Sequence, residues 1–374
     1  FLRRHADLSP DGLGAIYEID VNTKTPTLWM NLNSKTHLGS SATLFPHETA
    51  ANRGLSSPFA PSHDVWAYSR VAKEGLGGLD ISDDYKTIYA MDLSNRQLLV
   101  IDTASKTVSN RYPITNPGCD GGAGDVRPFA VDYIKGEVYV GVSCSGETRQ
   151  KDSDVNAHVM KLTGSSFTSV VSTATGFKWE SYWTDEVYAY GSSCNNLSYS
   201  LRNAYIPLIT NIELDNNNNM VIGVTSRNGF RFGEGNYAAD ESCNKLIKGH
   251  ESRGFVLNAT PSGSQWNLSS NELWNTDNGD EKHHYKDGIY AHWGSGTSQT
   301  YIGGMAKTDC SGEEVILTNL MDPLAHETSG TRYMRTSDAQ QEAAQSIGDT
   351  TIATSTASTR ELTRGVGNSW EKSA

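Results

Sequence analysis

The sequence predicts an all-β protein, and three observations lead to that prediction. Residues 77–102 read as three short strands separated by polar turns at residues 82–84 and 94–96. Apolar and polar residues alternate in these strands, as expected where one face is buried. The same pattern returns later in the chain, and the whole chain is rich in the Gly, Asn, Ser and Thr that favour turns and strand ends.

The strand–turn–strand pattern returns near residues 129, 212 and 304. Each copy joins one strand, a polar turn and a second strand rich in β-branched residues. The starts are about 51, 83 and 92 residues apart, and the two longer gaps fit doubled periods of about 42–46 residues. Weaker units would then begin near Phe167 and Gly254. A period of about 40–50 residues with four strands per unit is typical of a β-propeller.

The opening strand at residues 15–20 completes a predicted single domain, residues 1–374. This domain would be a propeller of about seven blades, with roughly six as the nearest alternative. Residues 360–366 would form the strand that closes the ring by pairing of the N- and C-terminal strands, which removes sheet edges. Residues 338–345 are the one segment that reads as a helix. An ordinary pair of β-sandwiches is the alternative architecture.

Composition excludes several partners. The chain has 374 residues and a net charge of −12, from 43 acidic and 31 basic side chains. This balance argues against nucleic acid and against anionic membrane surfaces. No stretch approaches the roughly 18 apolar residues that a membrane-spanning helix needs, so no membrane insertion is expected. The missing N-terminal Met suggests a processed or trimmed piece of a longer product.

Five cysteines predict an extracellular location. None stands in a C-x-x-C pair, so a zinc site is not expected. We predict two disulfides, Cys119–Cys144 and Cys194–Cys243. Each would close a loop of tens of residues and stabilise the fold by roughly 3–4 kcal/mol. Disulfides form in oxidising compartments, and the alternative is a cytosolic protein with five reduced thiols.

A long irregular stretch at residues 33–74 predicts a loop insertion over one face of the domain. It gathers imidazole, carboxylate, guanidinium and indole groups, which can hydrogen-bond to or stack on a glycan or protein ligand. A second aromatic-rich stretch covers residues 173–205. The candidate ligand-binding residues are His47, Glu48, Arg53, His63, Asp64, Trp66 and Trp183. The alternative for the tryptophans is that their rings fill space between blades.

No motif predicts catalysis. No G-x-S-x-G element stands in a strand–turn–helix context, and abundant Ser, His and Asp residues do not establish a triad. We therefore expect no catalytic residue and no enzymatic activity. The alternative is a secreted hydrolase or lyase acting on polysaccharide, for which Asp125, Arg127 and Arg227 are further candidates around a central channel.

One turn offers oxygen ligands for a metal. Asp277 and Asp280 flank a glycine, as in calcium-binding loops, but the distal glutamate of a complete loop is missing. A solvated turn explains the same residues. We expect no cofactor, and calcium at Asp277 and Asp280 is the one metal candidate.

Several strand-and-turn segments carry a resemblance across residues 75–323. They are residues 75–82 with 91–96, 125–130 with 139–141, 212–215 with 220–223, and 303–306 with 312–316 and 322–323. These segments resemble the N-terminal, propeller-like region of very large bacterial surface proteins that carry SdrD-B-type repeats. The resemblance implies an extracellular, adhesin-like module on a bacterial cell surface. Its partners would be a glycan or surface protein, further domains of the same polypeptide, or copies of itself in a filament or ring.

Overall fold

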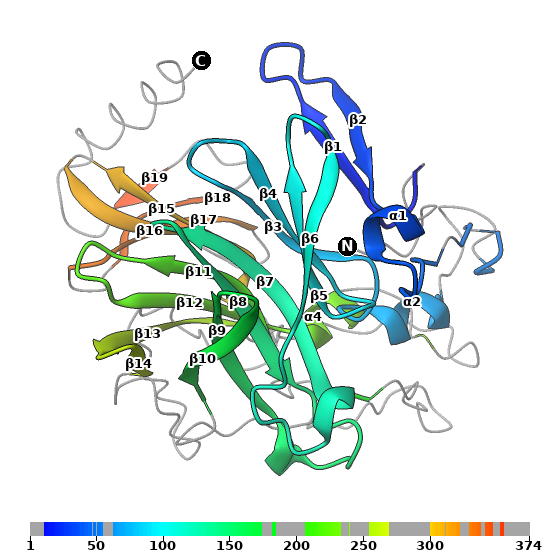
Figure 1. Cartoon of the computed structure of the whole chain (residues 1–374). Coiled ribbons are helices and arrows are strands. Elements are labelled where there is room, and N and C mark those ends of the chain that lie inside the picture. Colours follow the sequence, from blue (N-terminus) through cyan, green and yellow to red (C-terminus); the bar gives the residue numbers. More distant parts are fainter. Residues whose placement is uncertain are drawn as a thin grey trace.

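The computed structural model describes residues 11–46, 48–49, 51–54, 63–173, 182–184, 206–232, 239, 254–268, 300–310, 312–321, 329–337, 341–346 and 352–354. Within these ranges the chain forms four antiparallel sheets of four or five strands and one two-stranded sheet. Figure 1 shows the sheets fanned about a common centre in chain order. The architecture is therefore all-β and propeller-like, as the sequence predicted.

Each large sheet is a meander whose strands follow one another in the chain, and we call these sheets blades. The first blade contains β3 (Leu76–Ile81), β4 (Thr87–Asp92), β5 (Gln97–Asp102) and β6 (Thr107–Pro113). The second contains β7 (Val126–Ile134), β8 (Glu137–Cys144), β9 (Asn156–Thr163) and β10 (Ser166–Ser172). The third contains β11 (Pro207–Leu214), β12 (Met220–Ser226), β13 (Phe255–Ser262) and β14 (Gln265–Leu268). The fourth contains β15 (Thr300–Cys310), β16 (Glu313–Met321), β17 (Ser329–Arg335), β18 (Gln341–Ser346) and β19 (Ile352–Thr354).

The remaining elements are short. A hairpin of β1 (Ala15–Ile19) and β2 (Pro26–Asn31) precedes the first blade. The described α-helices are α1 (Lys35–Leu38) and α2 (Val65–Arg70), before the first blade, and α4 (Arg227–Phe232), directly after β12. In the part of the chain that the structure describes, no helix is long and apolar enough to cross a bilayer.

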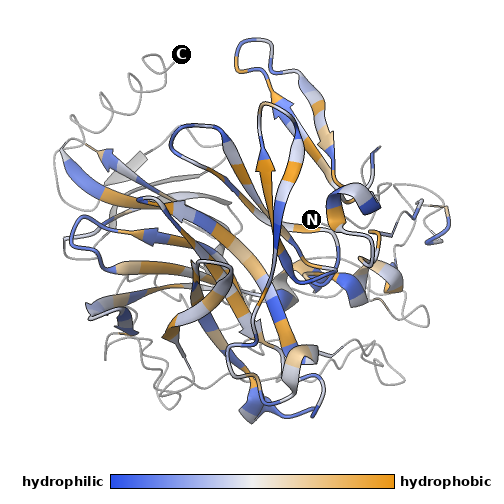
Figure 2. Cartoon of the chain, viewed as in Figure 1, coloured by the Kyte–Doolittle hydropathy of each residue, from blue (hydrophilic) through white to orange (hydrophobic). Residues whose placement is uncertain are grey.

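The hydrophobic core lies between neighbouring blades, and Figure 2 shows the apolar strand residues that form it. Leu98 of the first blade clusters with Val140 of the second, Val159 of the second with Ile209 of the third, and Val221 of the third with Tyr301 of the fourth. Each meander thus buries its faces against its neighbours. This is the physical reason why a single copy of the pattern predicts further copies.

Two glycines allow the blades to approach closely. A Cβ atom on Gly141 of β8 would lie 2.4 Å from Cγ2 of Ile209, and one on Gly223 of β12 would lie 2.3 Å from the Tyr301 hydroxyl. Both glycines occupy the second strand of their blade and receive a large side chain from the inner strand of the next blade. The close approach therefore requires a residue without a side chain at both positions.

Carboxylates also join successive inner strands, which are β3, β7, β11 and β15. The acceptor–donor pairs are Asp80 Oδ2 with Tyr133 N at 2.6 Å, Asp132 Oδ2 with Ile212 N at 3.0 Å, and Glu213 Oε1 with Lys307 N at 3.3 Å. Each bond satisfies a backbone N–H that borders the neighbouring blade. We refer to these three carboxylates as the seam carboxylates.

The weaker units predicted near Phe167 and Gly254 do not begin there. Phe167 lies in β10, the outermost strand of the second blade, and Gly254 directly precedes β13, the third strand of the third blade. Insertions between recognisable strands account for the spacing, because they lengthen a gap as an additional blade would. The described residues contain four blades and one hairpin, so the prediction of about seven blades is not confirmed.

Two further expectations concern the end of the chain. Residues 338–345 were expected to be helical, but strand β18 (Gln341–Ser346) occupies most of this segment and pairs with β17 and β19. Tertiary pairing here outweighs the helical preference of alanine and glutamate. The closing strand expected at residues 360–366 lies outside the described residues. Within them, β1 pairs with β2 alone, so ring closure between the terminal strands is not shown.

The predicted disulfide Cys119–Cys144 is present, with Cα atoms 5.2 Å apart. It ties the segment between the first two blades to the end of β8. The second predicted pair, Cys194–Cys243, lies outside the described residues.

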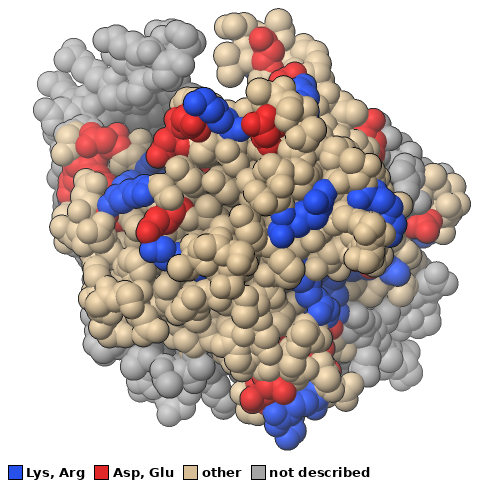
Figure 3. Space-filling model, in the orientation of Figure 1, with Lys and Arg blue, Asp and Glu red and all other residues tan. Residues whose placement is uncertain are grey.

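On the face seen in Figure 3, acidic and basic side chains are interspersed.

Candidate functional site: the axial cavity

A cavity of about 900 Å³ lies where the inner strands of all four blades meet. Its lining includes Gly77 and Gly78 of β3, Phe129 of β7, Thr210 of β11 and Gly303 of β15. We call it the axial cavity. Its size falls within the range of about 300–1,000 Å³ that is usual for ligand pockets.

A β-bulge interrupts every inner strand beside the axial cavity. The register shifts fall between Leu76 and Leu79, Pro128 and Val131, Ile209 and Asn211, and Tyr301 and Met305. A bulge leaves its extra residues without partners in the ladder and bends the strand. All five lining residues named above fall inside these shifts. The bulges therefore supply much of the cavity wall.

The wall formed by β3 is mostly backbone. A Cβ atom on Gly77 would lie 2.7 Å from the carbonyl oxygen of Phe129, and one on Gly78 would lie 2.8 Å from the backbone nitrogen of Val131. Strand β3 thus packs its main chain directly on that of β7. Glycine is required at both positions, and the wall presents peptide groups in place of side chains.

The polar side chains in the wall are mainly neutral. Thr210 Oγ1 lies 2.8 Å from the Tyr301 hydroxyl. With its amide oriented so that both terminal atoms are satisfied, Asn211 donates from its nitrogen to the carbonyl oxygen of Gly303 at 2.8 Å. Burial raises the pKa of the Tyr301 hydroxyl far above its ordinary value, so this group stays protonated. Asn319 adds an exposed amide from β16.

Glu74 is the one charged side chain among the described lining residues. Its Oε2 lies 3.1 Å from Arg70 Nε, four residues earlier. Both side chains are about one-third exposed, so water screens the pair. The cavity therefore carries little net electrostatic field of its own.

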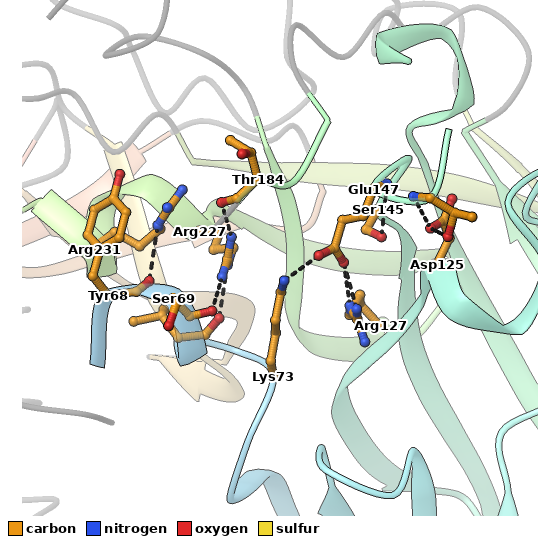
Figure 4. A network of polar contacts seen from close by, with 12 residues as sticks. Tyr68, Ser69, Lys73, Asp125, Arg127, Ser145, Glu147, Thr184, Arg227 and Arg231 are labelled. Atoms are coloured by element: carbon orange, nitrogen blue, oxygen red, sulfur yellow. Dashed lines mark hydrogen bonds and ion pairs between the residues drawn. The ribbon is translucent and has the colours of Figure 1, made fainter. Parts of the chain in front are cut away.

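Arg227 of α4 holds the segment that forms one rim of the axial cavity (Figure 4). Its guanidinium donates to the carbonyl oxygens of Val71 at 2.9 Å, Ser69 at 2.9 Å and Thr184 at 3.2 Å. The same group lies 4.8 Å from the centre of the Trp183 ring. Val71 lines the cavity, so a fully buried arginine positions the rim through its backbone.

Arg231 supports the same rim one helical turn later. Its Nε donates to the carbonyl oxygen of Tyr68 at 3.3 Å, and its guanidinium lies 3.8 Å from the centre of the Tyr68 ring. Phe230, between the two arginines, lines the axial cavity. Helix α4 therefore contributes both to the cavity wall and to the support of α2.

An ion cluster fixes the neighbouring part of this end of the molecule (Figure 4). The Glu147 carboxylate pairs with Lys73, just before β3, and lies 2.7 Å from Arg127 Nη2 of β7. Burial acts to raise the pKa of Glu147, but Arg127 and then Lys73 outweigh it and hold that pKa below its ordinary value. Asp125, fully buried, accepts hydrogen bonds from the backbone and hydroxyl of Thr148 at 2.9 and 2.6 Å. These contacts tie the segments before β3 and after β8 to the start of β7.

The structure brings four of the predicted ligand-binding residues to α2. Arg53 forms a buried ion pair with Asp64, and Asp64 caps α2 by accepting from the Ala67 backbone at 3.0 Å. Trp66 stacks with Arg70, whose guanidinium carbon lies 4.4 Å from the ring centre. His63 is half-buried beside the start of the helix.

The remaining predicted ligand-binding residues are Glu48, His47 and Trp183. Glu48 is half-buried in the loop before α2, and His47 lies outside the described residues. Trp183 is 1% exposed and stacks on Arg227, so it supports the rim from inside the fold. None of the predicted ligand-binding residues belongs to the described lining of the axial cavity.

The lining residues were missed because most are apolar or glycine. One sequence signal could have found part of the site. The pairs Gly77–Gly78 and Gly303–Gly304 interrupt strands, and glycine within a strand indicates a bulge or a close backbone approach. The calcium candidates Asp277 and Asp280 lie outside the described residues. Within them, no group of three or more His, Cys, Asp or Glu side chains could hold a metal ion.

Comparisons with known proteins find distant relatives. No family model matches the chain. Colossin-C of Dictyostelium discoideum is 24% identical over 235 residues, which cover 61% of this chain and 22% of that protein. Colossin-D of the same organism is 25% identical over 170 residues, covering 44% of this chain and 16% of that protein. The chain thus spans about a fifth of the length of the curated relatives it matches.

Similar solved structures include three enzymes. An endo-arabinase from Bacteroides thetaiotaomicron has a TM-score of 0.37 at 10% identity, covering 75% of this chain and 83% of that one. A putative 6-phosphogluconolactonase from Bacteroides uniformis has a TM-score of 0.33 at 9% identity, covering 75% and 55%. Quinohemoprotein alcohol dehydrogenase from Comamonas testosteroni has a TM-score of 0.36 at 11% identity, covering 89% and 42%. These values assign no activity to this chain.

The prediction that the chain is not an enzyme is contradicted by this comparison, because the similar solved structures are enzymes. We therefore withdraw it. The prediction relied on the absence of a local sequence motif. A site assembled from several strands leaves no such motif, since its residues are far apart in the chain. The fold and the cavity define an all-β, propeller-like module with a central pocket.

Proposed function

We propose that this chain is an extracellular binding module of a longer polypeptide and that it holds its ligand, a glycan or a segment of a surface protein, in the axial cavity. The observation that carries the proposal is the cavity of about 900 Å³, framed by bulges in four inner strands. An apolar wall with a few neutral polar groups suits ligand binding.

Two further observations support an extracellular module within a longer polypeptide. The Cys119–Cys144 disulfide favours an oxidising, extracellular compartment. The chain covers 22% and 16% of its curated relatives, which fits a module within a longer protein. Adhesion at a bacterial cell surface is the role that the sequence resemblance supports. Self-assembly into a filament or ring remains a prediction.

A matched pair of variants tests whether the axial cavity binds the ligand. Asn319 lines the cavity and is exposed, so Asn319→Trp places an indole over the opening without filling the core. Asn110→Trp is the control, because Asn110 is exposed on the outermost strand of the first blade. A glycan array and a peptide array identify a ligand, and calorimetry measures its affinity. We expect Asn319→Trp to weaken binding about tenfold or more. Equal affinities for the two variants would place the ligand elsewhere.

Hydrolysis of a glycan in the same cavity is the second candidate, and Glu74 favours it. A carboxyl group in a cavity can act as a general acid, although glycosidases use two carboxyl groups. Incubation with polysaccharides and chromatography of the products tests this candidate. Loss of turnover with retained binding in Glu74→Gln would support it, and absence of products from the parent chain would exclude it for those substrates.

A further inference from the structure

The composition of the wall indicates the chemical class of the ligand. We propose that the axial cavity takes an uncharged, hydroxyl-rich ring, such as a neutral sugar unit of a glycan; this inference rests on the proposed function. Three properties of the wall lead to it, namely its charge, the peptide groups of its bulges and its aromatic rings.

Charge argues against an ionic ligand. Among the described lining residues there is no Lys, Arg or His, and the one carboxylate, Glu74, is paired with Arg70. An anionic group such as a uronate or sulfate would lose water without gaining a counter-charge. Arg227, which holds the rim, donates to three backbone carbonyl oxygens. A cationic ligand would have to compete with Arg70 for Glu74.

The peptide groups of the bulges favour a ligand with many hydroxyl groups. Gly77, Gly78 and Phe129 lie inside register shifts and have no partner residue across the ladder. Backbone N–H and C=O groups need hydrogen-bond partners once a ligand displaces water. A hydroxyl group both donates and accepts, so it can satisfy either kind. A hydrocarbon ligand could satisfy neither.

Aromatic rings suit the apolar face of a sugar. Phe129 of β7 and Phe230 of α4 line the cavity, are half-buried and pack against the same buried cluster. Leu76 and the buried Leu208 also line the cavity. A sugar ring presents C–H groups on its faces and hydroxyl groups at its edge. This arrangement matches flat rings beside peptide groups and the amide of Asn319.

The test compares neutral and acidic sugars of equal length on the full chain. Calorimetric titrations would use neutral tetrasaccharides of glucose, mannose, galactose and arabinose, and tetragalacturonate as the acidic probe. We expect at least one neutral tetrasaccharide to bind, and tetragalacturonate to bind at least about tenfold more weakly. Asn319→Lys adds a cation to the wall, so it should raise affinity for tetragalacturonate about tenfold. Asn110→Lys, on the outer strand, should leave that affinity unchanged.

Two results would overturn the inference. Tetragalacturonate binding as tightly as every neutral sugar would contradict the charge argument, and so would equal responses of Asn319→Lys and Asn110→Lys. If a peptide binds and Asn319→Trp blocks it, while no sugar binds, the ligand class is wrong but the proposed binding function stands. If nothing from either array binds, both proposals fail.

Discussion

Asp132 belongs to the inner strand β7, and its Oδ2 accepts a hydrogen bond from the backbone of Ile212 in the next inner strand, β11, at 3.0 Å. Burial, followed by repulsion from Asp80 and Glu213, raises the pKa of Asp132 well above its ordinary value. Burial also raises the pKa of Glu213. A protonated carboxyl group can still accept the backbone hydrogen bond. The seam carboxylates can therefore join the blades without all being charged.

Asp132→Asn should make the protein more stable near neutral pH. The folded-state pKa of Asp132 is raised, so its favourable contribution is complete below the unfolded pKa of about 3.9 and is lost as pH rises through the folded pKa. Asparagine keeps the acceptor for Ile212 and removes the charge. We expect a higher melting temperature than the parent at about pH 8, with a difference that shrinks toward about pH 4. Circular dichroism melts across this range measure it.

Asp84→Asn provides a control in which the pKa of the replaced carboxyl group is shifted in the opposite direction. Hydrogen bonds from the Ser82 hydroxyl and then the Lys86 backbone lower the pKa of Asp84. Its contribution is therefore present above the unfolded pKa and is lost as pH falls. This variant should not be stabilised at about pH 8. If both variants respond alike to pH, the seam explanation is wrong.

At the scale of elements, bulges and one short helix build the site. The four bulges all occur on inner strands, and α4 follows β12 directly. Strand alternation and turn chemistry are local and could be read from the sequence. Asp92 accepts from the Asn95 backbone at 3.0 Å, for example, and so forms the turn that residues 94–96 predicted. The bulges were missed because their positions are determined by packing against the next blade, which is not a local property of the sequence.

Arg227→Lys should weaken both stability and ligand binding. A guanidinium serves three carbonyl oxygens around the rim, whereas an ammonium on a flexible stem cannot reproduce that fork. Each buried carbonyl left without a donor costs about 1–3 kcal/mol. We expect a loss of about 2–3 kcal/mol in the free energy of unfolding, measured with urea, and weaker binding of the cavity ligand.

Arg111→Lys is the matched control for this prediction. Arg111 also donates to two backbone carbonyl oxygens, those of His37 and Thr36, but it is half-buried and packs on α1. We expect a smaller loss of stability and no change in ligand affinity. An effect on binding equal to that of Arg227→Lys would mean that the rim is not specifically involved.

At the scale of the whole molecule, stacking of blades and one cross-link set the stability. The cores lie between blades, so each blade depends on its neighbours. The Cys119–Cys144 disulfide adds a covalent tie across 25 residues. Extracellular proteins commonly use such ties, and this one was predictable because Cys119 and Cys144 flank an inner strand.

Replacing both Cys119 and Cys144 with serine should lower the free energy of unfolding by about 3 kcal/mol, because the unfolded chain regains the entropy of an open loop. Guanidinium unfolding of the parent and the variant measures the difference. Mass spectrometry after alkylation without reductant counts the protected cysteines, and four would show a second disulfide, as the prediction of Cys194–Cys243 requires. An unchanged unfolding midpoint would contradict the stabilising role of the observed disulfide.

Local patterns were sufficient to place the first two strands of each blade, the turns between them and the observed disulfide. Alternation with a period of two and aspartate-capped turns depend only on residues close together in the chain, so they can be recognised from a single sequence. Tertiary structure alone decided the number of blades described and the position of the cavity. Insertions hide the repeat spacing, and the bond from Arg227 to Ser69 joins residues 158 positions apart. Such contacts form only when the blades pack against one another, so no sequence motif predicts them.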